Sequence, residues 1–74
     1  QAYDVVEVNI VADIIIALSS MVPKMIKPDG IFISSGIISE RLNDVEQALQ
    51  ENGFRILDIK REKDWVAITS RYEG

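Results

Sequence analysis

The sequence predicts an α/β fold: a partial doubly wound, Rossmann-like sheet with the element order β-α-β-α-β-β and a closing antiparallel hairpin. Two segments rich in β-branched residues, 3–10 and 31–35, are typical of buried strands. Between them, apolar residues recur at the spacing of one helix face. Residues 54–72 contain two further strand-like segments separated by a short polar turn, which is typical of a hairpin.

The first strand is expected over Tyr3–Ile10, because its nearly continuous β-branched run suits a strand that is covered on both faces. Residues 12–27 then carry one wide apolar helix face. Pro23 falls inside this helical pattern. We expect it to interrupt the helix and to lie in the first turn of a second, short helical segment.

A turn is expected at residues 28–30, Pro-Asp-Gly, because proline presets φ and glycine accepts a positive φ. The second strand, residues 31–35, ends at a glycine. Ser39 is expected to cap the next helix, which should end at residues 52–53, Asn-Gly.

The third strand, Phe54–Arg61, is more polar, so we expect it near an edge of the sheet. The fourth strand, Trp65–Tyr72, follows after a short polar turn. Helical crossovers between strands of one sheet are right-handed, so the first three strands should be parallel. The last strand should be antiparallel to them.

Composition excludes several classes of function. The chain has no cysteine and no histidine, which excludes disulfides, Cys/His zinc sites and Ser-His triads within it. A net charge of −4 argues against general nucleic-acid binding. No apolar segment is long enough to suggest a membrane span. We expect a cytoplasmic protein without a metal ligand, and, since the chain starts at Gln1 rather than Met, a fragment over 1–74 of a longer protein.

Ligands of open α/β sheets bind at the carboxyl ends of the strands. Asn9 lies at the end of the first strand, where its amide can both donate to and accept from a polar ligand. Alternatively, Asn9 caps the helix that follows or bonds to backbone groups of the loop. Ser35 and Gly36 lie at the end of the second strand, either as a small-residue wall of a substrate cleft or as ordinary turn residues.

Four short motifs occur in order along the chain: Asn9-Ile10-Val11-Ala12, Lys27-Pro28-Asp29-Gly30, Ser35-Gly36-Ile37 and Trp65-Val66-Ala67. Together they resemble the C-terminal half of a class I S-adenosylmethionine-dependent methyltransferase, most of all the bacterial family that methylates ribosomal large-subunit protein eleven. Asp29 stands where that family has a glycine, and we expect the turn to need a positive φ only at Gly30.

The resemblance implies direct methyl transfer from S-adenosylmethionine to an amine of a ribosomal protein substrate. It implies that Asn9 contacts the methyl donor and that Ser35 and Gly36 border the cleft; it implies no catalytic residue. The family's glycine-rich loop and its ribose-binding acidic residue would precede Gln1. The isolated fragment is therefore expected to be inactive.

Two alternatives remain open on the sequence. The absence of a complete site is compatible with a non-enzymatic α/β interaction module. A half of a dehydrogenase domain is disfavoured by the closing hairpin, because an antiparallel last strand is typical of methyltransferases. In the parent fold, the first strand pairs with a strand that this chain lacks. Tyr3–Ile10 is thus expected to be an open apolar edge that supports self-association.

Overall fold

The computed structural model describes residues 2–74, so Gln1 lies outside the described residues. It confirms the predicted α/β fold and the predicted element order. The elements are β1 (Tyr3–Asn9), α1 (Ala12–Ser19), the 3₁₀ helix η1 (Val22–Lys24), β2 (Ile26–Ile37), the 3₁₀ helix η2 (Ser39–Arg41), α2 (Leu42–Glu51), β3 (Phe54–Arg61) and β4 (Val66–Tyr72).

The four strands form one sheet in the order β1-β2-β4-β3. β1 and β2 pair in parallel, whereas β4 pairs antiparallel with both β2 and β3. The strands β1, β2 and β3 therefore run in the same direction, as predicted, and the hairpin places β4 between β2 and β3. Both β1 and the more polar β3 lie at edges of the sheet, which confirms the predicted position of each.

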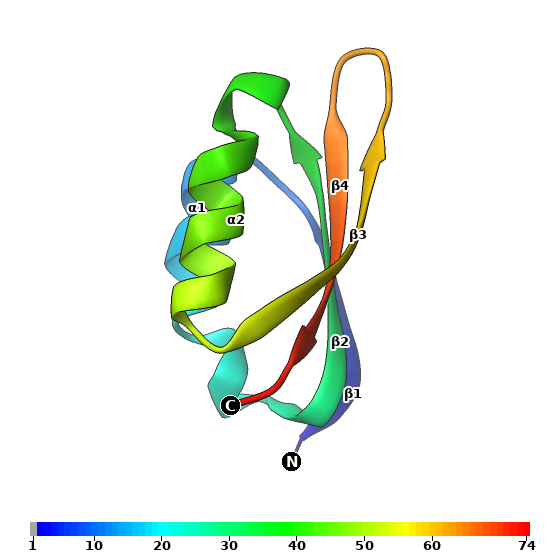
Figure 1. Cartoon of the computed structure of the whole chain (residues 1–74). Coiled ribbons are helices and arrows are strands. Elements are labelled where there is room, and N and C mark those ends of the chain that lie inside the picture. The colour runs from blue at the N-terminus through cyan, green and yellow to red at the C-terminus, as the bar shows by residue number, and fades with distance from the viewer. Residues whose placement is uncertain (1) are drawn as a thin grey trace.

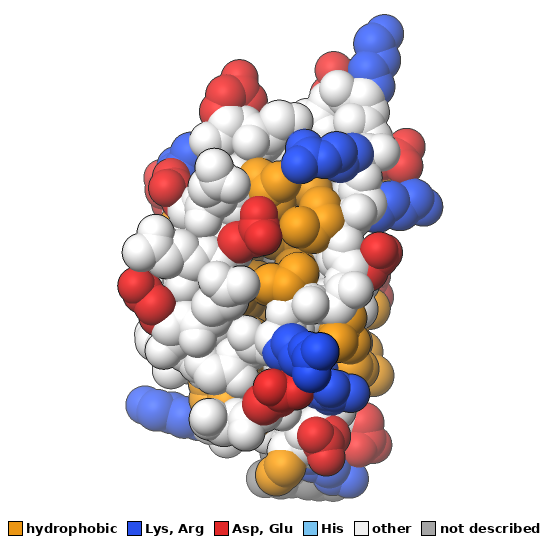
Figure 2. Space-filling model, viewed as in Figure 1, with side chains coloured by type: hydrophobic (Ala, Val, Ile, Leu, Met, Phe, Trp, Pro, Cys, Tyr) orange, Lys and Arg blue, Asp and Glu red, His pale blue; other side chains and the backbone are white. Residues whose placement is uncertain are grey.

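Both α-helices lie on the same face of the sheet (Figure 1). The core between the two layers is fully buried, with Phe32 and Ile68 from the sheet and Ile15, Val45 and Leu49 from the helices. Figure 2 shows apolar side chains along the seam between the helix layer and the sheet, with charged residues around them. This seam is where the half-buried apolar residues of the edge strand β3 join the core.

The opposite face of the sheet carries no helix among residues 2–74. Successive right-handed crossovers that add strands in one direction place their helices on the same side. Val5 points away from the helices and is 54% exposed. The prediction that the first strand is covered on both faces is therefore wrong for the described chain. β-branched composition reports strand propensity, but burial depends on which elements pack against the strand.

The predicted helix ends agree with the structure in part. Helix α1 ends at Ser19, and Pro23 lies in the first turn of η1, as expected. Gly53 follows α2 with a φ of 90°, which confirms the predicted glycine at the helix end. Ser39 does not cap a helix through its side chain: it is the first residue of η2, and neither η2 nor α2 has a side-chain cap.

The Pro-Asp-Gly segment forms an irregularity within β2 rather than a separate turn. The register of β1 with β2 shifts at this point, since Tyr3 pairs with Ile26 and Val5 pairs with Ile31. The positive φ of 65° belongs to Asp29, which corrects the prediction that only Gly30 needs one. Gly30 serves a different need, because a Cβ there would lie 2.6 Å from Ile26 Cγ1.

Two serines lie in the apolar core under the helices, and they differ in hydrogen bonding. Ser70 Oγ donates to the carbonyl oxygen of Phe32 at 3.1 Å. Ser34 is equally buried, yet its hydroxyl has no hydrogen-bond partner among residues 2–74. An unpaired buried hydroxyl destabilises the folded state because it has lost its contacts with water. Ser34 is therefore an energetic weak point on the central strand β2.

Candidate functional site

Asn9 and Gly36 meet at the carboxyl ends of the two parallel strands. Asn9 pairs with Ser35 in the sheet, and Gly36 is the residue that follows Ser35 along β2. A Cβ at Gly36 would lie only 2.5 Å from Asn9 Oδ1, and the φ of Gly36 is 82°. Both facts favour glycine at this position. The Asn9 side chain consequently lies directly against the backbone of Gly36.

Asn9 does not cap helix α1. The residue that precedes this helix is Val11, and the helix has no side-chain cap. The hydrogen bonds found among residues 2–74 include none to the Asn9 amide, which is exposed. The amide is thus available at the edge of the sheet where ligands of this fold class bind. This geometry removes the alternative in which Asn9 acts as a helix cap.

Ser35 is already engaged with the neighbouring strand. Its hydroxyl donates to the carbonyl oxygen of Val8 at 3.3 Å, and its own carbonyl accepts from the backbone N–H of Ile10 at 3.2 Å. The structure therefore brings Asn9, Ser35 and Gly36 together, as the sequence predicted. Ser35 holds the end of β1 in place, while Gly36 provides space for the Asn9 side chain.

A pocket of about 120 Å³ opens beside Gly36, between the segments that follow β1 and β2. Its lining consists of Val11, Ala12, Asp13, Gly36, Ile38 and Arg41. Most of its surface is apolar, and the side chains of Val11 and Ile38 are exposed at its rim. The pocket lies at the carboxyl edge of the sheet; Gly36 lines it, and Asn9 lies next to Gly36 but outside the lining.

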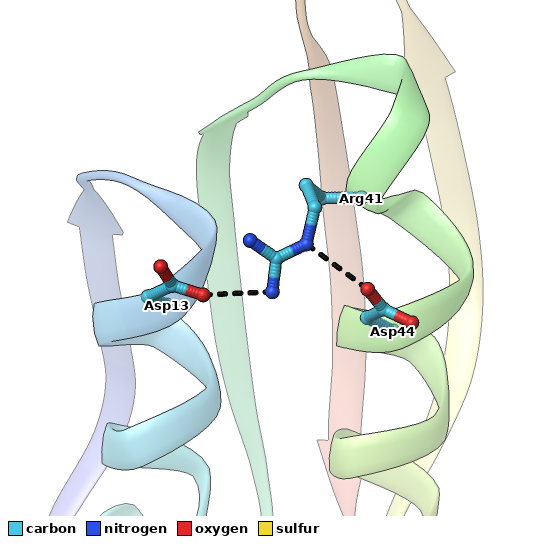
Figure 3. A network of polar contacts seen from close by, with 3 residues as sticks. All are labelled: Asp13, Arg41 and Asp44. Atoms are coloured by element: carbon cyan, nitrogen blue, oxygen red, sulfur yellow. Dashed lines mark hydrogen bonds and ion pairs between the residues drawn. The ribbon is translucent and has the colours of Figure 1, made fainter.

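Arg41 connects the two sides of this pocket (Figure 3). Its Nη2 lies 2.7 Å from Asp13 Oδ1 in the first turn of α1. Its Nε donates to Asp44 Oδ2 at 3.0 Å in the first turn of α2. The guanidinium group thus reaches from the start of α2 to the start of α1, and the Arg41 side chain is 33% exposed.

The two carboxylates raise the pKa of Arg41 above its ordinary value, mainly through the hydrogen bond to Asp13 and then through the bond to Asp44. A cation whose pKa is raised by folding stabilises the folded state fully at any pH below its pKa in the unfolded chain. This stabilisation is lost only as the pH rises through its pKa in the folded state. Arg41 therefore stays charged throughout the neutral range. Two carboxylates and one guanidinium give the network a net charge of −1.

Sequence reasoning did not find this network. The Arg41–Asp44 contact has the i,i+3 spacing of helical ion pairs, which is a signal in the sequence. The contact with Asp13 has no such signal, because the two residues are far apart along the chain and meet only in the folded state. Within residues 2–74 no cluster of acidic side chains is suited to hold a metal ion. None of the helices in this part of the chain has the length and apolarity to cross a membrane.

Comparison with known proteins shows consistent similarity to one family. The family model "Ribosomal protein L11 methyltransferase (PrmA)" matches residues 1–73. The ribosomal protein L11 methyltransferase of Dictyoglomus turgidum is 38% identical over 73 residues, which cover 99% of this chain and 24% of that protein. The enzyme of the same name from Thermoanaerobacter pseudethanolicus is 47% identical over 68 residues, or 92% of this chain and 22% of the relative. The chain thus spans about a quarter of the length of these curated relatives.

Solved structures agree with the sequence matches. The crystal structure of a ribosomal protein L11 methylase from Lactobacillus delbrueckii subsp. bulgaricus superposes with a TM-score of 0.93 at 32% identity, covering 99% of this chain and 38% of that one. The M1.HpyAVI–SAM complex superposes with a TM-score of 0.80 at 12% identity over 99% of this chain and 46% of that one. The second similarity concerns the fold alone.

Proposed function

Since the chain belongs to the ribosomal protein L11 methyltransferase (PrmA) family, we propose that residues 1–74 form the C-terminal half of a methyltransferase catalytic domain. The parent enzyme would use S-adenosylmethionine to methylate a ribosomal protein in the cytoplasm. The family match over residues 1–73 supports this proposal, and the names of the curated relatives support the substrate. The same match favours the enzyme over a non-enzymatic interaction module.

The observation that carries the proposal is the free Asn9 amide beside Gly36. Asn9 is exposed at the carboxyl end of β1, its amide lacks a hydrogen-bond partner among residues 2–74, and Gly36 has no side chain to obstruct the space next to it. These residues fit a polar group of S-adenosylmethionine, because an amide both donates and accepts hydrogen bonds. Ser35 keeps the end of β1 in position and borders the cleft.

When bound, S-adenosylmethionine supplies an activated methyl group on a sulfonium. The chain's own contribution is to orient the donor through Asn9 and to exclude water with the apolar side chains of Val11 and Ile38, one on each wall of the pocket beside Gly36. The side chains of Asn9, Val11 and Ile38 have no titratable group. We assign no general base and no catalytic residue to residues 1–74. Positioning two reactants accounts for a large share of the acceleration in a bimolecular transfer, so a site of this kind does not need a general base.

Residues 1–74 carry no G-x-G-x-x-G motif and no P-loop. Asn9 by itself offers one or two hydrogen bonds, each with a net value of about 0.5–1.5 kcal/mol. The isolated chain should therefore bind S-adenosylmethionine weakly and transfer no methyl groups. Calorimetric titration of the isolated chain tests this proposal, and micromolar affinity would contradict it.

Replacing Asn9 tests the donor contact in the full-length protein. Asn9→Ala should raise the Kd for S-adenosylmethionine about three- to tenfold, which corresponds to the loss of one hydrogen bond. Asn43→Ala is the matched control, because Asn43 is an exposed asparagine on α2. An unchanged Kd in Asn9→Ala, with methylation of the ribosomal protein intact, would refute the role of Asn9.

The edge strand β1 supports a second proposal about partners. Tyr3 and Val5 are more than half exposed, and β1 has a neighbour on one side only within residues 2–74. An open apolar edge pairs readily with another chain. We expect the isolated chain to self-associate through Tyr3–Ile10, and Val5→Lys to reduce this association. Sedimentation of a pure monomer at high micromolar concentration would contradict the expectation.

A further inference from the structure

The segments that follow β1 and β2 form the two walls of the pocket beside Gly36. Each segment continues directly from its strand, so the sheet fixes where each wall begins. The N–H of Ile10 bonds to the carbonyl of Ser35, which is the last such backbone bond on the β1 side before the segments separate. Beyond that point the separation of the walls depends on side chains. Arg41 makes the ion pair that crosses between them, through Asp13, above the apolar core in which α1 and α2 pack together.

We propose that Arg41 is a positioning residue for methyl transfer, because it sets the separation of the two pocket walls through Asp13. The inference rests on the proposed function, since it names a residue that shapes the same site. Arginine suits this task because its planar fork binds two carboxylates in fixed directions. Arg41 uses two different nitrogens for the two aspartates, so it holds α1 and α2 at the same time.

Arg41 does not serve as a receptor for an anionic ligand. Asp13 and Asp44 together outweigh its charge, and the Asp13 side chain beside it is 76% exposed. The field in the pocket thus disfavours an approaching carboxylate or phosphate. The geometry instead gives Arg41 an internal role that does not require contact with substrate.

The two ion pairs of Arg41 lead to different predictions. The pair with Asp13 joins the two walls, whereas the pair with Asp44 stays within the segment that runs from η2 into α2. If the separation of the walls matters, Asp13→Asn should reproduce the effect of Arg41→Gln. Asp44→Asn should retain nearly normal turnover, because it leaves the cross-wall contact in place. Arg41→Lys should restore turnover only in part, since one ammonium replaces a fork.

The test uses the full-length protein with S-adenosylmethionine and its ribosomal protein substrate. We expect kcat to fall about tenfold in Arg41→Gln and Asp13→Asn, because small displacements of reacting groups cost large factors in rate. The Kd for S-adenosylmethionine should stay within about twofold, since the ladder with β2 holds Asn9. Arg55→Gln is the control: it removes an exposed ion pair with Glu73, near the other end of the sheet.

Amide hydrogen exchange without donor or substrate provides a readout that does not need activity. Exchange at residues 10–13 and 36–41 should accelerate in Arg41→Gln and Asp13→Asn, but not in Asp44→Asn or Arg55→Gln. Normal exchange and normal kcat in Arg41→Gln would overturn the inference, and so would equal losses in Asp13→Asn and Asp44→Asn. If the wild-type protein transfers no methyl groups, the proposed function fails, while the exchange data still decide whether Arg41 holds the walls together.

Discussion

Gly36→Ala is the substitution that tests the candidate site most directly. The φ of Gly36 is 82°, and placing an L-residue in this left-handed region costs about 1–2 kcal/mol. The new Cβ would also lie 2.5 Å from Asn9 Oδ1, so the Asn9 amide must rotate away. A side chain forced off its rotamer costs about 0.5–1.5 kcal/mol. The free energy of unfolding should therefore fall by about 1.5–3.5 kcal/mol.

The same rotation should weaken donor binding, because it moves the amide that we assign to S-adenosylmethionine. We expect the Kd for the donor to rise about three- to tenfold in the full-length protein. Calorimetric titration measures the affinity, and urea denaturation measures the stability, at a temperature where both variants are folded.

Gly53→Ala is the matched control. Gly53 has a φ of 90°, and a Cβ there would lie 2.9 Å from the carbonyl carbon of Gly74 and 3.1 Å from the Tyr72 ring. It carries a similar backbone penalty but lies at the end of α2, away from Asn9. Gly53→Ala should lose stability and keep the wild-type Kd. If Gly36→Ala loses the expected stability while its Kd stays unchanged, the reasoning that connects Gly36, Asn9 and the donor is refuted.

Four further substitutions test the energetics of the fold. Asp29→Gly should raise the free energy of unfolding by about 0.5–1 kcal/mol, because glycine adopts the φ of 65° without steric cost. Asp29→Asn should change the free energy of unfolding little, because asparagine also tolerates this region. A loss of stability in Asp29→Gly would contradict the account. Ser34→Ala should stabilise by about 1 kcal/mol by removing an unpaired buried hydroxyl. Ser70→Ala should destabilise the fold by about 1 kcal/mol, since it removes the hydrogen bond to the carbonyl of Phe32. Equal stability changes in the two serine variants would show that hydrogen bonding does not determine these changes. Urea denaturation measures all of these changes.

Local signals predicted most of the fold. The bounds of β3, Phe54–Arg61, agree with the sequence prediction because an Asn-Gly helix end and a short polar turn enclose the strand. The break at Pro23 was predictable for the same reason, since proline removes a backbone donor wherever it stands. These features depend on neighbours in the sequence, which is why the sequence alone reveals them.

The errors concern properties that depend on packing between distant segments. Which residue of the Pro-Asp-Gly segment takes the positive φ depends on the shifted register of β1 against β2. Asp29 takes it, while Gly30 is required where Ile26 approaches the backbone. The exposure of Val5 likewise depends on which side the crossover helices occupy, and the β-branched run around it carries no information about that side.

The candidate site illustrates the same distinction. Asn9 and Gly36 were predictable as neighbours, because parallel strands end at the same edge and the residues of interest stood at those ends. The Arg41–Asp13 contact was not predictable, because it joins the starts of two helices that come together only in the folded state. The sheet thus fixes where the Asn9 amide lies, whereas the side-chain network fixes how far the pocket walls stand apart. For this reason substitutions at Gly36 should act mainly on donor affinity, and those at Arg41 mainly on turnover.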